Sequence, residues 1–540
     1  MAEAETILVG DIVTMSASAP TAEAVAVSNG HILAVGATDD VMARRGSGTE
    51  IVDLGSDALL PGLIEPHTHP DLCAQMYSWI DVSGFTHPTV DGVEAELTAA
   101  VAAADPGEWL FAFGLDFMLT TGLGAWTRDR LDRIAPANPL VVMIQSMHTL
   151  FVNSQALARA GIGESTPDPG GGGQYVRDAS GRLTGRIEEQ SAMGPFIVHG
   201  LPDPDQVTDL LLAQERRYAE VGITTIGVAG TFLGARQLDV LAEIARRDGA
   251  AHRVVTYLRH DDVGGTTWTP GAVDDRGRFR VAGVKLWYDG SPYTGTMLLD
   301  EPYLETDLCC CTLGIGAGTV GRANFEPGQL VDLLSELAAG GWQVLTHAQG
   351  DRACREIVDL YEAVLTTSRP ADHRWRLEHC ALISGDELRR TAGLGVSPSF
   401  HVDHVRYYGP ELRDEIIGAE RAEGLMPCRS ALDHGHRVSL HADSPMYPPG
   451  PLRLAGTAAS RRTRHGDTIA THEAISNIEA LRAVTIDAAW QLRMDDEVGS
   501  VEVGKRADFT VIDRNPLEVG SADLEHVDVT QTWLDGRPIA

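Results

Sequence analysis

Both ends of the chain carry short runs in which apolar and polar residues alternate, a pattern that predicts half-buried β-strands separated by tight turns. Asn29-Gly30 and Asp535-Gly536 stand between such runs, and these dipeptides are typical of two-residue hairpins. The runs occupy residues 5–15, 22–36, 50–62, 504–516 and 529–539. Neither end is long enough to fold alone, so we expect residues 1–60 and 490–540 to build one composite β-sandwich domain.

The middle of the chain repeats a different pattern, in which a short apolar strand with a polar end is followed by a helical stretch. The predicted strands lie within residues 61–69, 222–230, 253–261, 280–290, 342–351, 375–383, 395–404 and 437–445. Helical periodicity is clearest at 327–341 and 351–365. Eight strand-then-helix units predict an α/β fold, a (β/α)₈ TIM barrel, over residues 61–489.

The gap after the first barrel strand is much too long for one crossover. It contains strand-like runs of its own at 108–116 and 139–147. We therefore expect an inserted subdomain at about 75–215. The glycine run Gly170–Gly173 lies in this insert without the following Lys-Ser/Thr of a phosphate loop, and it predicts a flexible turn.

Composition places limits on the environment and partners. Lys and Arg number 43 against 76 Asp and Glu, which gives a formal net charge of −33. Because nucleic acids and anionic membranes need a basic face, we expect neither as a partner. The acidic N-terminus lacks the basic and apolar regions of a signal peptide, no apolar run reaches the ~18 residues of a membrane span, and the seven cysteines are sparse. These features favour the cytoplasm. We expect Cys309–Cys311 to lie in a loop.

Six polar residues fall at the carboxyl ends of predicted barrel strands, where barrel enzymes keep their chemistry. They are His67 and His69 after strand 1, Lys285 on strand 4, His347 on strand 5, His379 on strand 6 and Asp443 after strand 8. Each has an ordinary explanation alone: a hydrogen-bonded histidine, an ion-paired lysine or a turn aspartate. Their joint placement at one mouth predicts a catalytic site.

This set resembles the metal-dependent amidohydrolase superfamily, and residues 498–516 (VGSVEVGKRADFTVIDRNP) are similar to its C-terminal signature. The segments 148–162, 168–185 and 284–291 resemble the YtcJ-like, amidohydrolase-3 group. The resemblance covers essentially the whole chain and implies a hydrolase with a small-molecule substrate, built as a homodimer.

The resemblance also implies a ligand set for Zn²⁺, one or two ions, or for other divalent metals. His67, His69 and Asp443 would hold one metal and His347 and His379 the other. A protonated lysine cannot bind zinc, so Lys285 would react with CO₂ to form a carbamate that bridges both metals. The alternative is an unmodified Lys285 beside a single metal.

Metal-activated hydroxide would attack a polarised carbonyl, and Asp443 would act as general base and then general acid. We expect cleavage of an amide, N-acyl or N-formyl carbon–nitrogen bond. The alternatives are hydrolytic deamination or ring opening of a cyclic amide, and, more remotely, an inert barrel used for binding or assembly. The intact six-residue set argues against the last.

A second group of residues is expected near the substrate. Its members lie at other strand ends or, in one case, in the insert. They are His148, Trp287, Tyr288, Asp289, Tyr293, His401 and His404.

Overall fold

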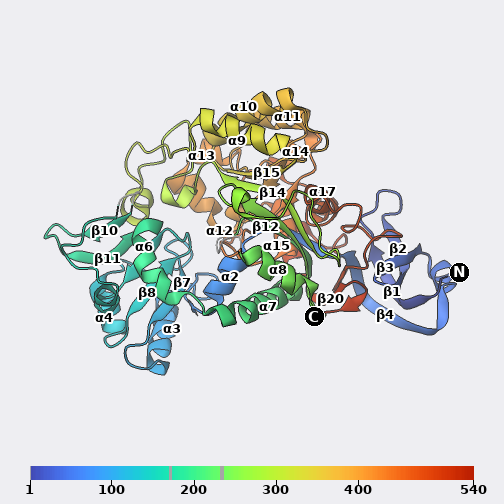
Figure 1. Cartoon of the computed structure of the whole chain (residues 1–540), viewed down its shortest axis with the longest axis horizontal. Helices are drawn as coiled ribbons and strands as arrows, with labels where there is room; N and C mark the ends of the chain where they lie inside the picture. The colour runs from blue at the N-terminus through green and yellow to red at the C-terminus, as the bar shows by residue number, and fades with distance from the viewer. Residues whose placement is uncertain (1, 170–172, 232–235, 540) are drawn as a thin grey trace. The chain divides into compact units, whose positions relative to one another are not determined.

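The computed structural model describes residues 2–169, 173–231 and 236–539, which form two compact units (Figure 1). One unit comprises Met1–Asp71, Leu212–Cys311 and Ile315–Ala540, and the other comprises Leu72–Leu211 and Thr312–Gly314. Of the predicted glycine turn, residues 170–172 lie outside the described residues. The domain boundaries expected from the sequence stay a prediction.

Eight parallel strands form the barrel of the first unit, and this confirms the predicted fold class. Neighbours pair in the order β18-β17-β16-β15-β14-β13-β12-β5. The strands are β5 (Leu63–Thr68), β12 (Ile223–Ala229), β13 (Arg253–Arg259), β14 (Phe279–Trp287), β15 (Gln343–Ala348), β16 (Arg376–His379), β17 (Ser397–Phe400) and β18 (Ser439–Leu440). The His69 N–H donates to the Ser444 carbonyl over 2.9 Å, which brings the first strand beside the last and nearly closes the barrel.

Helices follow most of the barrel strands. They are α7 (Pro204–Glu220), α8 (Arg236–Arg246), α9 (Pro327–Ala339), α10 (Asp351–Ser368), α11 (Gly385–Leu394), α12 (Asp403–Glu411), α13 (Ala419–Ala422), α14 (Cys428–Asp433), α15 (Pro451–Ser460), α16 (Asn477–Ala483) and α17 (Ile486–Gln491). The connection from β13 to β14 is the exception, since residues 260–278 are described throughout and contain only a short 3₁₀ turn.

The two helices with the clearest periodicity form where the sequence predicts them. In α9 a proline occupies the first turn, where its missing N–H costs nothing, and Leu330, Leu334 and Leu337 bury one face. In α10 the buried face includes Ile357 and Tyr361. Both helices pack their apolar face inward, as barrel helices do.

Strands from both chain ends share one seven-stranded sheet, with the order β21-β20-β19-β4-β1-β2-β3. In Figure 1 the blue β1 to β4 and the red β20 come from opposite ends of the chain. The strands are β1 (Ala4–Val13), β2 (Thr21–Ser28), β3 (His31–Gly36), β4 (Arg45–Pro61), β19 (Phe509–Ile512), β20 (Val529–Leu534) and β21 (Arg537–Pro538), with α1 (Thr38–Met42) after β3. Both predicted hairpins form, because Asn29-Gly30 and Asp535-Gly536 adopt the positive φ angles that this turn requires.

The terminal sheet is joined to the barrel at Gly62, between β4 and β5. A side chain at this position would meet Thr224 Oγ1 at 2.0 Å, so only glycine allows the approach. Nearby, the fully buried Arg253 of β13 donates to Asp508 over 2.6 Å and also pairs with Asp535. A buried charge needs such partners, so this ion pair network ties the C-terminal part of the terminal sheet to the barrel strand.

The second unit holds a six-stranded sheet in the order β10-β11-β9-β8-β7-β6. Its strands are β6 (Ile80–Asp81), β7 (Leu110–Leu115), β8 (Leu140–Ile144), β9 (Thr149–Val152), β10 (Gln174–Arg177) and β11 (Leu183–Glu188). Its helices are α3 (Val90–Ala103), α4 (Arg128–Ile134), α5 (Ser154–Arg159) and α6 (Gln190–Ile197), and α2 (Pro70–Tyr77) leads into it. The two strands predicted in the insert correspond to β7 and β8.

One local expectation is wrong. Cys309–Cys311 lie in a π-helical turn, Leu308–Leu313, rather than in a loop. The Cys309 thiol is buried and donates to the Glu415 carbonyl over 3.2 Å, which the sequence pattern does not reveal.

None of the helices in the described parts of the chain has both the length and the apolar character to cross a bilayer.

The buried Glu215 of α7 allows a prediction of how the stability of the protein depends on pH. Burial raises the pKa of this carboxyl to about 7, more than the N–H of Ala251 and nearby arginines lower it. Since the unfolded carboxyl titrates near its ordinary value, the folded protein binds the extra proton between about pH 4.5 and 7, and stability falls as pH rises through that window. In Glu215→Gln the melting temperature relative to wild type rises by about 1–2 °C between pH 5 and pH 8.

The control is Glu220→Gln, an exposed position on the same helix, for which the difference from wild type stays flat. Scanning calorimetry of both variants across the pH range makes the comparison. A pH-independent difference for Glu215→Gln contradicts the assignment.

Candidate metal centre

The six predicted residues lie at the carboxyl ends of five barrel strands. His67 belongs to β5 and His69 follows it, Lys285 lies on β14, His347 on β15, His379 ends β16, and Asp443 follows β18. All are buried except Asp443, whose side chain is 18% exposed. Parallel strands of a barrel present these ends at one mouth, which explains why residues more than 370 positions apart meet.

His67 is held by a buried carboxylate that the sequence did not identify. Its Nδ1 lies 2.5 Å from Glu378 Oε2, and Glu378 in turn pairs with Arg376 at 2.8 Å. Burial alone would raise the pKa of Glu378, but the charge of Arg376 and the hydrogen bond from His67 outweigh burial and hold that pKa at about 2. The carboxylate therefore accepts the Nδ1 proton of His67 and leaves the Nε2 lone pair pointing to the mouth.

The ring nitrogens of His67 and His69 converge on Asp443. Its Oδ1 lies 3.3 Å from His67 Nε2 and 3.1 Å from His69 Nε2. His69 Nδ1 faces the Gly230 carbonyl at 3.4 Å, an acceptor for a proton on that nitrogen.

These three residues fit a divalent metal. Two imidazole lone pairs and a carboxylate oxygen meet within 4.8 Å of one another. Asp443 Oδ1 is buried and accepts no hydrogen bond from the described residues. Electron-rich atoms so placed repel one another unless a cation lies between them, and imidazole nitrogen with carboxylate oxygen is a preferred donor set for Zn²⁺.

Lys285 lies next to this group and is fully buried. Its Nζ is 3.2 Å from His67 Nε2, and no carboxylate oxygen of the described residues comes within 4.0 Å of it. The simple buried ion pair that the sequence left open is therefore not formed. Burial lowers the pKa of Lys285 to about 8, against the opposing charges of Glu378 and Asp443.

His347 and His379 lie side by side, with ring centroids 4.2 Å apart, and His379 is 4.9 Å from the ring of His67. His347 Nε2 donates to the Gly290 carbonyl over 3.2 Å. Burial and the charge of Lys285 lower the pKa of His347 to about 3, and burial lowers that of His379 well below its usual value. Both rings are thus neutral, the form that binds metal.

Backbone conformation marks the same place. His379, Cys380 and Asp443 have φ angles of 73°, 52° and 54°, in the left-handed region that side chains other than glycine rarely adopt. Such strain persists only where surrounding contacts enforce it, and it clusters at functional sites.

Of the second group, His401, His404 and Tyr293 lie near the centre. His401 Nε2 donates to the Ala442 carbonyl over 3.0 Å, and His401 forms a ligand-distance set with His379 and Asp443. His404 Nδ1 is 2.8 Å from the Tyr293 hydroxyl and 2.6 Å from that of Tyr447. Together they form an aromatic and imidazole wall beside the predicted ligands.

The remaining members have other surroundings. Trp287 lies 5.3 Å from Lys285 Nζ, measured to its ring centroid. The Tyr288 hydroxyl donates to Glu356 of α10 over 2.5 Å. Asp289 accepts the N–H groups of Leu298, Gln349 and Gly350, each over 3.0 Å. Asp289 thereby fixes the loop after β14, and it lies 3.6 Å from His347 Nε2.

His148 belongs to the second unit. There its Nδ1 lies 3.2 Å from Glu189 Oε2. Its role at the substrate stays a prediction.

Sequence reasoning missed the residues that support the histidines, namely Glu378, Arg376 and His441. A signal for them exists in the alternation of strand residues, because Arg376 and Glu378 are two positions apart on β16, and His441 is two before Asp443. Charged or imidazole side chains at such interior positions indicate polar partners inside the barrel.

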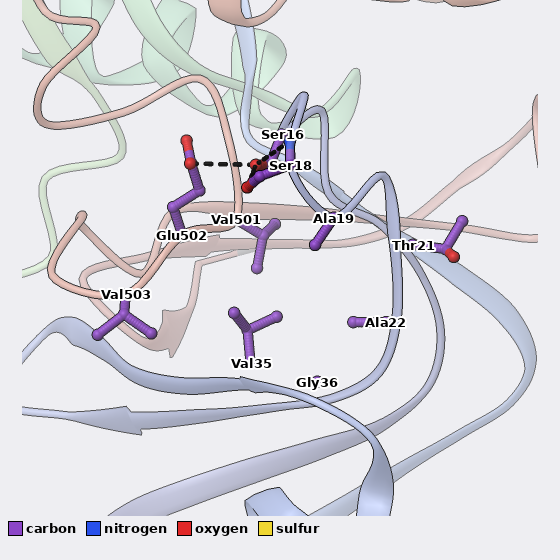
Figure 2. A pocket seen from close by; sticks show the side chains of 10 residues that line it. All are labelled: Ser16, Ser18, Ala19, Thr21, Ala22, Val35, Gly36, Val501, Glu502 and Val503. Atoms are coloured by element: carbon purple, nitrogen blue, oxygen red, sulfur yellow. Dashed lines mark hydrogen bonds between the residues drawn. The ribbon is translucent and has the colours of Figure 1, made fainter.

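A separate pocket of about 260 Å³ lies in the terminal sheet (Figure 2). Half of its lining residues are alanine or valine, and its carboxylate, Glu502, already accepts hydrogen bonds from Ser16 over 3.1 Å and from Ser500 over 2.5 Å. This lining contains no histidine, lysine, cysteine or second carboxylate, so it offers neither a base to activate its hydroxyl groups nor a metal-ligand set.

The fold and the centre together define a barrel hydrolase of the metal-binding kind. A sequence model of the amidohydrolase family matches residues 50–540, so the chain belongs to that family. It is 29% identical to the N-substituted formamide deformylase of Arthrobacter pascens, over 98% of this chain and 97% of that protein. It is 24% identical to the putative amidohydrolase YtcJ of Bacillus subtilis, over 98% of each chain.

Among solved structures, an uncharacterized metal-dependent hydrolase from Pyrococcus horikoshii OT3 has the same fold. Its TM-score is 0.75 at 21% identity, and the match covers 96% of this chain and 99% of that one. The predicted family and the predicted enzyme class, a metal-dependent amidohydrolase acting on carbon–nitrogen bonds, are confirmed.

The convergence at Asp443 predicts which residues retain metal. After loading with Zn²⁺ and desalting, wild type keeps at least about one equivalent, whereas His69→Ala keeps less than about half, because a three-ligand set loses one donor. Metal is counted by inductively coupled plasma mass spectrometry.

Thr68→Val is the matched control, since Thr68 lies between the two histidines but bonds the Tyr218 hydroxyl over 2.7 Å. It keeps the wild-type metal content. Equal metal content in His69→Ala and wild type would remove His69 from the centre.

Proposed function

We propose that the protein hydrolyses the amide carbon–nitrogen bond of a small N-formyl or other N-acyl compound. The observation that carries the proposal is the convergence of His67, His69 and Asp443 beside a buried Lys285 without a carboxylate partner. The formyl specificity is supported by the end-to-end similarity to a deformylase of N-substituted formamides.

The ligand assignment follows the lone pairs. His67, His69 and Asp443 would hold one zinc ion, and His347 and His379 a second. Lys285 would bridge them after its neutral amine adds to CO₂, which forms one C–N bond and releases one proton to give the carbamate. The lowered pKa of Lys285 favours the neutral amine, which is the form that reacts with CO₂. Burial away from water favours retention of the carbamate.

Zinc bound there would polarise the substrate carbonyl and lower the pKa of a water molecule towards about 7. Asp443 stays ionised, so it can accept a proton from that water and pass it to the leaving nitrogen. One water is consumed, the amide C–N bond breaks, and a carboxylic acid and an amine are released; for a formamide these are formate and the amine.

The wall of His401, His404 and Tyr293 gives the substrate a partly aromatic surface with a few polar groups, which suits a small organic molecule. Deamination or ring opening of a cyclic amide would use the same metal ligands, and these reactions are the second candidates. A homodimer and a cytoplasmic location stay predictions.

Asp443 provides the direct test of the chemistry. Asp443→Asn keeps the shape of the side chain but cannot accept the proton, so kcat on N-alkylformamides falls by about 10²–10⁴-fold. The assay measures formate release from N-alkylformamides by the zinc-loaded enzyme. The same panel tests hydrolysis of N-acetyl, aryl-amide and lactam compounds and release of ammonia from aminopurines.

Asp261→Asn is the control, because this carboxylate also follows a barrel strand but is exposed and pairs with Arg259 at 2.7 Å. It keeps wild-type kcat. Release of ammonia from aminopurines without formate release from formamides would favour deamination instead.

Substitutions of Lys285 test whether its carbamate bridges the two metals. Lys285→Ala loses activity, and a short carboxylic acid with bicarbonate restores part of it by supplying the two oxygens of the carbamate. Lys285→Arg keeps the charge but forms no carbamate, so it is inactive and is not rescued. Wild-type kcat in either variant would remove Lys285 from the centre.

A further inference from the structure

We propose that His441 is a positioning residue, which fixes the ring tautomer of His379 through a hydrogen-bond relay starting at Gln491. The relay consists of Gln491, Ser439, Ser399, His441 and His379. It rests on the proposed metal role of His379, and it adds a reason why that ring offers one particular nitrogen to the centre.

The relay is anchored by Gln491, the last residue of α17. Its side-chain amide donates to the carbonyls of Pro398, over 2.9 Å, and Arg437, over 2.8 Å. Both amide protons are thus used, and the carboxamide cannot be flipped without placing its oxygen against two other oxygens. Gln491 Oε1 is therefore an acceptor, and Ser439 Oγ donates to it over 2.7 Å.

The two serines transmit this direction. Ser439 has a single hydroxyl proton, which Gln491 takes. Ser439 Oγ is also oriented as a donor towards Ser399 Oγ, 2.8 Å away. Because the one Ser439 proton is committed to Gln491 Oε1, which cannot donate, Ser399 supplies the proton for this second contact. Because Ser399 donates its only hydroxyl proton to Ser439, its Oγ accepts a hydrogen bond from His441 Nδ1 over 2.8 Å. Any other assignment leaves two lone-pair atoms, either two oxygens or an oxygen and a nitrogen, in close contact with no proton between them.

The ring tautomers of His441 and His379 follow from the same count of protons. With its proton on Nδ1, the neutral His441 ring presents the Nε2 lone pair to His379 Nδ1, 3.1 Å away. His379 must donate from Nδ1, which leaves its Nε2 lone pair for a metal. All five side chains are no more than 1% exposed, so bulk water cannot supply or remove a proton along the relay.

The relay gives a reason for the buried imidazole of His441, at a position in the barrel interior where an apolar side chain would be usual. The ring of His441 also stacks on that of His67, with 4.6 Å between the ring centroids. A hydrogen-bonded partner behind a ligand histidine fixes ring orientation and typically changes metal affinity by about 10–100-fold. The competing role is direct ligation, because His441 also forms a ligand-distance set with His67 and His379.

The test compares metal affinity and ligand field in relay variants. Dissociation constants for Co²⁺ are measured by chelator competition, and the visible spectrum of the cobalt protein reports the ligand set. Ser399 contacts none of the predicted metal ligands. In Ser399→Ala we nevertheless expect Co²⁺ to bind about 10–100-fold more weakly, with an unchanged visible spectrum of the cobalt protein. Ser397→Ala, the same substitution two residues earlier on β17, keeps wild-type affinity.

His441 itself gives the second comparison. His441→Ala weakens binding as Ser399→Ala does, whereas His441→Gln, whose carboxamide oxygen can accept from His379 Nδ1, recovers affinity to within about threefold of wild type. Unchanged affinity in Ser399→Ala overturns the relay. A changed cobalt spectrum with loss of bound metal in His441→Gln overturns it in favour of direct ligation.

A metal-free readout separates the relay from the proposed function. In protein with ¹⁵N-labelled histidine rings and no metal, the relay predicts Nδ1-protonated His379 and His441, identified by the loss of their signals in His379→Gln and His441→Gln. An Nε2-protonated His441 contradicts it. Wild-type protein that binds no Co²⁺ but shows these tautomers would reject the metal role and retain the relay.

Discussion

The centre depends on one electrostatic constraint, which is that electron-rich atoms are forced together at the barrel mouth. His67 Nε2 and His69 Nε2 both face Asp443 Oδ1 at 3.3 Å or less, in a buried setting where repulsion is poorly screened. The closed succession of strands fixes these positions, so the side chains cannot separate. A divalent cation relieves this repulsion, which is why the arrangement indicates a metal rather than a hydrogen-bonded cluster.

The surrounding structure keeps each ligand in its binding form. Glu378, paired with Arg376, accepts a hydrogen bond from the Nδ1–H of His67. The carbonyl of Gly290 accepts one from the Nε2–H of His347. Burial keeps the rings of His347 and His379 neutral, and the backbone at His379 and Asp443 adopts the left-handed conformation. Stability and function therefore compete locally, since buried polar groups are costly unless every one of them has a partner.

The sequence allowed much of the barrel to be predicted, because strand ends and helical periodicity are local signals. All eight strands form where expected, and so do α9 and α10. What it could not supply is the pairing inside the barrel. Glu378 and His441 look like ordinary strand residues, and only the closed sheet brings Glu378 to His67 across 311 positions. The buried π-helical turn at Cys309 depends likewise on a distant carbonyl, that of Glu415.

The most direct test of the central claim is anomalous diffraction at the zinc edge from crystals of the zinc-loaded protein. We expect a peak about 2.0–2.2 Å from His67 Nε2, His69 Nε2 and an Asp443 oxygen. We also expect a metal bound to His379 to be held through Nε2. A zinc peak held by other residues, or the absence of a peak at the barrel mouth, would contradict the claim.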